Sequence, residues 1–451
     1  MQPLRMYFPP SQYNKKIKLS TRCHIHETLS LLDKGLDIPM TKSEKEWFED
    51  HMQFKHIFHL KKDPNHKVMG MWMLLLRTAC IEKKKEVWFV VNGVQIRYGL
   101  REHALMSGLD CRAYPEGYMN AGSERFKRKH FRNLRRVRLE DVKEKLQTMV
   151  PDRTHDRLKM MVLYFLVSIL VGDTKNSGKL ATPIDSLCLR AVNDLQFCAT
   201  FPWGRYSFEH MLKSISHTMR HFDGVVEKEG AIWPVPGFCI PMELLAFEAI
   251  PTLGNEFIEF RPDADIECPR MCRRKFKQGA MKGFSLKKLN DVLGETKDIV
   301  SIIECTDEES VLLEEIIDEG HEDDDVHDVV VESWMNLISK GKGVFFEEMF
   351  DEDVVARSEN EDTLPTPRIA FNTLEAQLNT LQEEVSSKFV IIFEKLDGLE
   401  KRFNELEASV KRTEEDEETA GEQKKTKKEK GEKRPAPLEP GSRPKTRSKK
   451  N

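Results

Sequence analysis

The stretch that most limits the fold is "RLKMMVLYFLVSILV", residues 157–171, which is apolar on every side of a helix. A surface helix would keep one polar face, so this pattern predicts a helix at the centre of a hydrophobic core. The stretch is shorter than the roughly 20 residues that a membrane-spanning helix needs. The chain therefore has a packed interior, and we expect no membrane span.

The composition allows a sizeable folded region and distributes the charges unevenly. A chain of 451 residues is long enough for two or three domains, and a hydrophobic content of 39% can build at least one core. Charged residues reach 32% while the net charge is only -4, so strong electrostatic behaviour requires segregated charge. The N-terminus lacks the apolar core of a signal peptide, and nine scattered Cys favour reduced thiols in the cytosol or nucleus, without structural disulfides.

Helical patterning dominates residues 45–255, the predicted folded domain, which follows an irregular lead-in over residues 1–44. Residues 67–81, "KVMGMWMLLLRTACI", read as a buried helix. In "TPIDSLCLRAVNDLQF" we expect Thr182 as the N-cap, and in "SFEHMLKSISHTM" we expect Ser207 as the N-cap.

A β-hairpin is predicted at "VWFVVNGVQIRY". Asn92 and Gly93 supply the two positive φ angles of a type I′ turn, which pairs Val91 with Val94, Phe89 with Ile96 and Val87 with Tyr98 on one apolar face. On the other face Trp88 lies opposite Arg97, an arrangement suited to cation–π stacking at a partly exposed site. If the domain binds a ligand, this pair is the first place to look.

The next stretch, "LREHALMSGLDC", reads as a short helix with Gly108 as its left-handed C′ residue and Leu109 closing back on it. Glu102 and His103 are adjacent, so they point about 100° apart on the helix and do not form a pair. Cys111 falls beyond the cap. The stretch is therefore interpreted as scaffold rather than as an active site.

Four ordered stretches carry a family resemblance: "VWFVVNGVQIRYGLREHALMSGLDC", "LKMMVLYFLVSILVG", "DLQFCATFPWGRYSFEHML" and "GFCIPMELLAFEAIP". Together they resemble the plant domain of unknown function 1985, over roughly residues 45–255. The resemblance implies a transposon-related origin and kinship to proteins that often carry a SUMO-protease domain. It implies no catalytic residue within the domain itself.

A protease of that class would need a His, an acidic partner, an oxyanion Gln and an Asp-Cys-Gly nucleophile. Here Asp110 and Cys111 are followed by Arg112, and the C-terminal half leaves no room for the protease fold. We therefore expect no enzyme activity, no catalytic residue and no cofactor. "CHIH", with Cys23, His24 and His26, lies far from Cys268 and Cys272, so we expect no metal site.

One basic stretch, "ERFKRKHFRNLRRVR", interleaves aromatic residues with cations. It is a candidate nucleic-acid surface, in which the cations neutralise phosphate and Phe126, His130 and Phe131 stack on bases. In the alternative interpretation the Phe side chains are buried and the cations form a solvated helix face. The candidate DNA-contacting residues are Arg125, Lys127, Arg128, Lys129, Arg132, Arg135, Arg136 and Arg138.

The charge changes twice after the predicted domain. Residues 256–295 are basic, and residues 296–368 read as an acidic disordered linker, with thirteen Asp or Glu and no Lys or Arg over residues 304–328. Within it, "VSIIECTDEES" and "DVVVES" join β-prone runs to acids, as in peptides that add a strand to SUMO. The alternative is that both runs are ordinary apolar fragments.

Residues 369–412 predict a coiled coil, because apolar residues recur at heptad steps with one stutter at Val385. An isolated helix would leave this seam exposed, so we expect a homo-oligomer or a partner helix. The predicted oligomerisation residues are Leu374, Leu378, Leu381, Val385, Phe389, Ile392, Leu396, Leu399, Phe403, Leu406 and Val410.

Residues 413–451 form a Lys- and Arg-rich tail without an apolar pattern, which is typical of disorder. Two basic clusters separated by a spacer fit the acidic grooves of a nuclear import receptor. The predicted import residues are Lys433, Arg434, Lys445, Arg447, Lys449 and Lys450.

These features predict a mainly α chain with a small β-hairpin (an α+β domain) in the N-terminal half, then an acidic disordered linker, a C-terminal coiled coil and a disordered basic tail. We expect a non-enzymatic nuclear scaffold of transposon-related origin that self-associates. The alternatives are a DNA-binding accessory protein that uses residues 124–138 and the tail, and a degenerate relative of SUMO proteases without peptidase activity.

Overall fold

The computed structural model describes residues 4–21, 24–60, 68–172, 182–226, 232–235, 237–265, 267–277, 284–318 and 325–358. All of these belong to one compact unit, residues 1–360. The predicted coiled coil (369–412), with its seam, and the tail (413–451), with its import residues, lie outside the described residues. They stay predictions.

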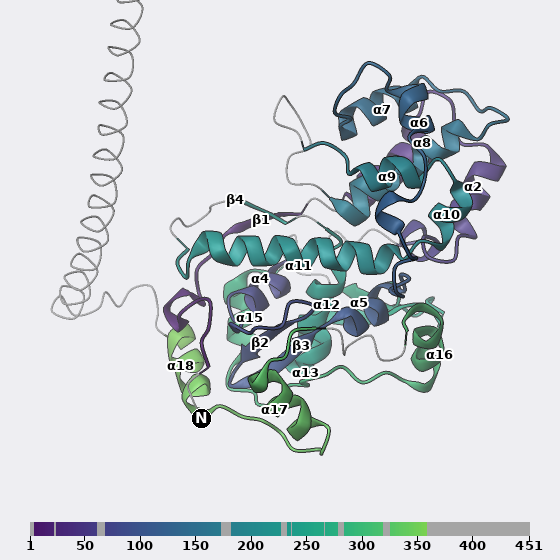
Figure 1. Cartoon of the computed structure of the whole chain (residues 1–451). Helices are drawn as coiled ribbons and strands as arrows, with labels where there is room; N and C mark the ends of the chain where they lie inside the picture. The colour runs from purple at the N-terminus through teal and green to yellow at the C-terminus, as the bar shows by residue number, and fades with distance from the viewer. Residues whose placement is uncertain are drawn as a thin grey trace, which may run out of the picture. The chain divides into compact units, whose positions relative to one another are not determined.

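The described unit is mainly helical and contains a small antiparallel hairpin, as predicted (Figure 1). Its helices are α1 (Ile25–Ser30), α2 (Lys42–Glu49), α3 (Lys55–Phe58), α4 (Met69–Leu75), α5 (Leu100–Ser107), α6 (Arg125–His130), α7 (Leu139–Gln147), α8 (Asp156–Phe165), α9 (Ser186–Ala191), α10 (Leu195–Thr200), α11 (Trp203–Phe222), α12 (Ile240–Ala249), α13 (Pro251–Phe257), α14 (Arg270–Arg273), α15 (Leu286–Leu293), α16 (Asp307–Ile316), α17 (Val329–Ile338) and α18 (Glu347–Ser358).

Six short strands form three two-stranded sheets. These are the parallel pair β1 (Lys18–Thr21) and β4 (Ile232–Val235), the antiparallel hairpin β2 (Val87–Val91) and β3 (Val94–Tyr98), and the antiparallel pair β5 (Ile258–Phe260) and β6 (Arg274–Phe276). Short 3₁₀ or π turns are η1 (Pro10–Gln12), η2 (Leu31–Gly35), η3 (Tyr118–Asn120) and η4 (Leu166–Val171).

The all-apolar stretch forms the predicted central helix. It comprises α8 and the π-helical η4, and every residue from Met160 to Val171 is buried. Phe165 lies 5.4 Å from Phe48 and 5.0 Å from Phe54 between ring centroids, so the helix is held by aromatic contacts from α2 and the residues before α3. None of the described helices is both long and apolar enough to span a membrane.

The second predicted buried helix is α4, which is shorter than residues 67–81. It packs against α12, where a Cβ at Gly70 would lie only 2.7 Å from the Phe247 ring. The Glu243 carboxylate of α12 accepts hydrogen bonds from the backbone N–H groups of Gly70 and Met71, which are free at a helix start. The close packing therefore fixes α4 at its N-terminal end.

Two predicted helix starts are wrong. Asp185, not Thr182, caps α9 by accepting from the Leu187 N–H, and Asp194 caps a separate helix, α10. Ser207 lies inside α11, because that helix already begins at Trp203; the Ser207 hydroxyl donates to the Gly204 carbonyl. Both errors arise because several Ser, Thr and Asp residues compete as caps, and tertiary packing selects among them.

The predicted domain boundaries at residues 45 and 255 are also wrong. On the N-terminal side, Phe8, Tyr13 and Leu32 of the predicted lead-in are buried in the main core. On the C-terminal side, α13 runs across the predicted boundary, and the predicted basic segment contributes α14 and α15 and buries Phe284 and Leu289. The lead-in has no clear apolar periodicity in its sequence, and in residues 256–295 the positive charge concealed the apolar positions.

The acidic segment 296–368 was predicted to be a disordered linker, but its described residues fold. They form α16, α17 and α18, and in Figure 1 α17 lies beside the β2–β3 hairpin. A small second core joins Val331, Trp334 and Val344 to Trp88 and Val90 of the hairpin. Widely spaced apolar residues thus suffice to anchor these helices despite the high acidic content.

Candidate interaction surfaces

The hairpin has the predicted register, with Asn92 (φ 44°) and Gly93 (φ 71°) at its turn. The prediction that its far face is partly exposed is wrong, since Trp88 is fully buried and Arg97 is 6% exposed. The carboxylate of Glu86 accepts from both Trp88 Nε1 (3.1 Å) and Arg97 Nε (2.8 Å).

Trp334 of α17 closes this face, with its ring centroid 5.3 Å from that of Trp88. The Trp88–Arg97 pair is therefore part of an internal packing contact. Sequence reasoning missed this because the covering Trp334 lies in a segment whose composition indicated disorder.

The residues of α5 have structural roles, as the scaffold interpretation predicts. Glu102 accepts a hydrogen bond from the Gly99 N–H, a backbone donor at the start of α5. His103 lies between the Tyr98 hydroxyl (2.9 Å) and the Ser207 hydroxyl (3.2 Å), and burial lowers its pKa to about 3. Gly108 has the left-handed conformation predicted for the helix end.

Cys111 is enclosed by the first turn of α11. A Cβ at Gly204 would lie 2.6 Å from Cys111 Sγ and 2.6 Å from the Asp110 carbonyl oxygen, so the two segments touch through a residue without a side chain. Burial, and then the nearby Asp110 carboxylate, raise the pKa of the Cys111 thiol well above its ordinary value. This environment disfavours a thiolate nucleophile.

In the basic stretch 124–138, the alternative with buried aromatic residues is confirmed. Phe126 and Phe131 are buried, and His130 Nε2 lies 3.0 Å from the Asp156 carboxylate. The prediction that these rings stack on bases is therefore wrong. Lys127 and Lys129 form ion pairs with Glu124 and Asp156.

Five other cations of the stretch are exposed and have no ion pair with another described residue. They are Arg125, Arg128, Arg132, Arg135 and Arg136, and we call them the arginine strip. The eighth candidate, Arg138, is half-buried at the start of α7. Of the features predicted for a nucleic-acid surface, the exposed positive charges are therefore present, and the exposed aromatic rings are not.

The two runs predicted to add a strand to SUMO have contacts within their own chain. The Val300 N–H donates to the Ala249 carbonyl, and the Arg97 N–H of β3 donates to the Ser301 carbonyl. "DVVVES" begins α17 as a helix, with Asp328 as its N-cap. Strand addition by either run would require that run to leave the fold.

The arginines of the predicted basic segment neutralise two buried carboxylates. Arg270 pairs with Glu248 (3.0 Å) and Glu309 (2.8 Å), Arg274 also pairs with Glu248, and Arg273 also pairs with Glu309. The charge of these three arginines is therefore neutralised inside the fold, whereas Lys287 and Lys288 of the same segment are exposed.

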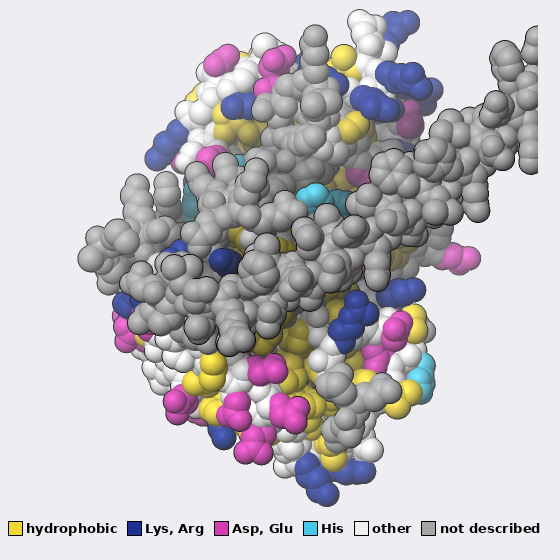
Figure 2. All heavy atoms as spheres, turned by 90° about the vertical axis from the view of Figure 1, so that its left-hand side faces the viewer, with side chains coloured by type: hydrophobic (Ala, Val, Ile, Leu, Met, Phe, Trp, Pro, Cys, Tyr) yellow, Lys and Arg dark blue, Asp and Glu magenta, His cyan; other side chains and the backbone are white. Residues whose placement is uncertain are grey.

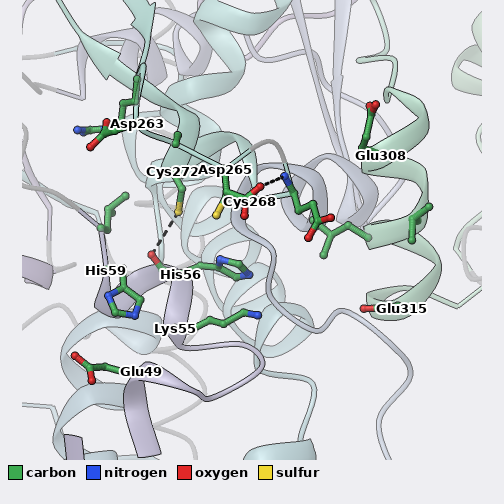
Figure 3. Close-up of a pocket in the computed structure, with 16 residues that line it drawn as sticks. Glu49, Lys55, His56, His59, Asp263, Asp265, Cys268, Cys272, Glu308 and Glu315 are labelled. Atoms are coloured by element: carbon green, nitrogen blue, oxygen red, sulfur yellow. Dashed lines mark hydrogen bonds between the residues drawn. The ribbon is translucent and has the colours of Figure 1, made fainter. Parts of the chain in front are cut away.

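A cavity of about 780 Å³ lies beside this network and is drawn in Figure 3. It is bounded by α3, the loop 261–268, α14 and α16, and both Cys268 and Cys272 line it. Cys272 Sγ donates to the His56 carbonyl (3.4 Å), and burial lowers the pKa of His56 to about 4. Among the described residues no three His, Cys, Asp or Glu side chains are grouped to hold a metal ion; Cys23 is outside them.

Comparison with known proteins places these features in a family. Residues 75–214, which include the hairpin and α8, match the domain of unknown function 1985, and residues 299–350 match the family described as Drosophila protein of unknown function 287. An Arabidopsis thaliana protein, named only as uncharacterized, is 33% identical over 359 residues, which are 79% of this chain and 44% of that relative. The chain thus spans less than half of that relative's length. No solved structure matches. The chain belongs to the plant family of proteins that contain the domain of unknown function 1985.

Proposed function

We propose that this chain is a non-enzymatic nuclear scaffold of transposon-related origin that self-associates through residues 374–410. The observation that supports it most is the series of apolar positions at heptad steps from Leu374 to Val410, with a single stutter at Val385. The environment of Cys111 and His103 agrees with this proposal, because both residues are buried within the packing of the domain. Peptidase activity is not part of the proposal.

Self-association is tested by measuring the molar mass of the full chain in solution by light scattering. Leu378→Asp together with Leu399→Asp places charges in the seam and should give monomers. Asn379→Asp together with Thr380→Asp, outside the seam, is the matched control and should keep the oligomer. A monomeric wild-type chain at micromolar concentration would contradict the proposal.

Nuclear localisation rests on the two basic clusters of the tail. Replacing Lys433, Arg434, Lys445 and Arg447 by Ala in a fluorescent fusion of the full chain should shift the signal to the cytoplasm. Unchanged nuclear fluorescence would show that these cations are not the import signal.

A second candidate function, DNA binding, is favoured by the arginine strip. Each phosphate contact contributes about 0.9 to the dependence of log affinity on log salt. Arg132→Gln, Arg135→Gln and Arg136→Gln together should therefore weaken binding of the full chain to a DNA duplex and lower that slope by about 3. Lys213→Gln, at an exposed position on α11, is the control. An unchanged slope would assign any DNA binding elsewhere, such as the tail.

A further inference from the structure

We infer that the cavity between α3 and α16 is a docking groove for a Lys- or Arg-rich segment of a partner protein that presents an apolar side chain. This inference goes beyond the proposed scaffold function, because it names a recognition surface of the folded unit and does not depend on self-association. It rests on the shape, the floor and the charge of the groove.

The groove has an apolar floor of the kind that buries a side chain. Leu60, Ala264, Val311 and Leu312 line it together with the two thiols. Val311 of α16 is 61% exposed, so it offers apolar surface to an incoming side chain. The groove has a volume of about 780 Å³, which falls within the range of about 300–1,000 Å³ that ligand sites occupy.

The rim of the groove is negative. Six carboxylates line it, against the cations Lys55 and Arg261. Asp265, Glu267, Glu308 and Glu315 have no ion pair with another described residue, and Figure 3 shows Glu308 and Glu315 on α16 at the far side of the cavity from Glu49 and His59. Since burial lowers the pKa of His56 to about 4, that imidazole is neutral at pH 7 and adds no compensating charge.

The neighbouring buried network explains why the rim stays negative. Besides Arg261, which lines the groove, the neighbouring Arg270, Arg273 and Arg274 are held by Glu248 and Glu309. Arg261 donates its Nε–H to the Arg274 carbonyl, which directs it along the backbone. The fold thus pairs the buried acids and leaves the exposed ones available to an external cation.

This charge selects the class of partner. A nucleic acid would meet charge of its own sign, and a purely apolar helix would place unpaired carboxylates around its contact. A basic segment with an apolar residue can bury that residue against the apolar floor and pair its cations with the carboxylates of the rim.

The test uses the full chain and a fluorescein-labelled synthetic peptide, Gly-Lys-Leu-Lys-Arg-Leu-Lys-Gly, measured by fluorescence anisotropy at low and physiological salt. We expect saturable binding that weakens with salt, since exposed ion pairs are screened. The same peptide with Leu replaced by Gly should bind more weakly, and a version with Glu in place of every Lys and Arg should not bind.

Asp265→Asn together with Glu315→Gln should weaken binding about three- to tenfold, as expected for the loss of two exposed ion pairs. Asn at position 265 keeps the oxygen that accepts the Glu267 N–H. Glu314→Gln is the matched control, because Glu314 is exposed on the same helix but does not line the groove. Val311→Ser should also weaken binding without unfolding the chain.

An equal loss with Glu314→Gln would show only a diffuse attraction to the acidic surface and would overturn the inference. Equal affinity for the peptides with Leu and with Gly would also overturn it, as would the absence of saturable binding. The variants that abolish self-association should leave the affinity per chain unchanged, so failure of either proposal is recognised separately.

Discussion

Asp353 is a charged residue in the interior that joins α18 to the hairpin. Its carboxylate accepts from Arg77 Nε (2.7 Å), Arg77 Nη2 (2.8 Å) and Arg357 Nε (2.8 Å), and from the Asn92 N–H at the hairpin turn. Burial alone would raise the pKa of Asp353, but the charges and hydrogen bonds of Arg77 and then the charge of Arg357 hold it below its ordinary value. Arg77 and Arg357 both need a negative partner at this position, and the Asp353 carboxylate supplies it.

Asp353→Asn should lower the free energy of unfolding by about 3–5 kcal/mol, since it leaves buried cations without their partner. Asp351→Asn, exposed on the same helix, should change it by less than about 0.5 kcal/mol. Urea unfolding of both variants at pH 7 measures the difference. Equal, small effects would mean that the buried network does not stabilise the unit.

Buried histidines give the stability a pH dependence of predictable sign. Burial lowers the pKa of His103 to about 3 and that of His51 to about 4, below the ordinary value of 6.5. The unfolded chain therefore takes up protons that the folded chain does not, and stability falls as the pH drops from about 6.5 toward 4.

His103→Gln should reduce this acid sensitivity, although the variant is less stable at pH 7. His217→Gln, at an exposed position on α11, should keep the wild-type pH dependence. The comparison of urea unfolding at pH 7 and pH 5 checks both. A wild-type stability that rises on acidification would show the sign to be wrong.

At the scale of elements, the sequence was informative where a local turn dictates geometry. Asn92 and Gly93 allow one register, so the hairpin pairs were predicted correctly. The helix α17 was not predicted, because its stability comes from Trp88, which is distant in sequence, and its own composition favours disorder. Local signals cannot report such a contact.

Trp334→Ala should detach α17 from the hairpin while the main core survives, because Trp334 belongs to the separate small core. The expected cost is about 3–5 kcal/mol for a buried aromatic residue, confined to this contact. Hydrogen exchange should then rise in residues 325–346 and at Trp88, but not in α8. Ser333→Ala, exposed on the same helix, should leave all exchange rates unchanged.

At the scale of the molecule, the folded unit is larger than the family match. Core residues come from Phe8 at one end to Leu313 at the other, whereas the matched residues are 75–214. Charge conceals the apolar positions of the C-terminal flank, and the N-terminal flank is a mixed sequence without a clear periodicity, which is why the predicted boundaries failed. The residues of the arginine strip were among those predicted, but the groove was not, since its rim and floor come from three stretches that lie far apart in the sequence.

A chain of residues 45–255 should therefore show no cooperative thermal unfolding by circular dichroism, because it lacks Phe8, Leu289 and the rest of both flanks. A chain of residues 1–360 should unfold cooperatively, since all these residues belong to its core. Cooperative unfolding of the shorter chain would show that the flanks are dispensable. The longer chain serves as the control for expression and solubility.

The contact between Gly204 and Cys111 has a consequence for how such sequences diverge. Since a Cβ at residue 204 would overlap both Cys111 Sγ and the Asp110 backbone, no larger residue fits there unless the opposite segment retreats. Gly-Leu-Asp-Cys (residues 108–111) and Pro-Trp-Gly-Arg (residues 202–205), both within the family match, are thus the two sides of one packing contact. Mutations at one side restrict those at the other, so in an alignment of relatives the residues equivalent to 111 and 204 should change together or not at all.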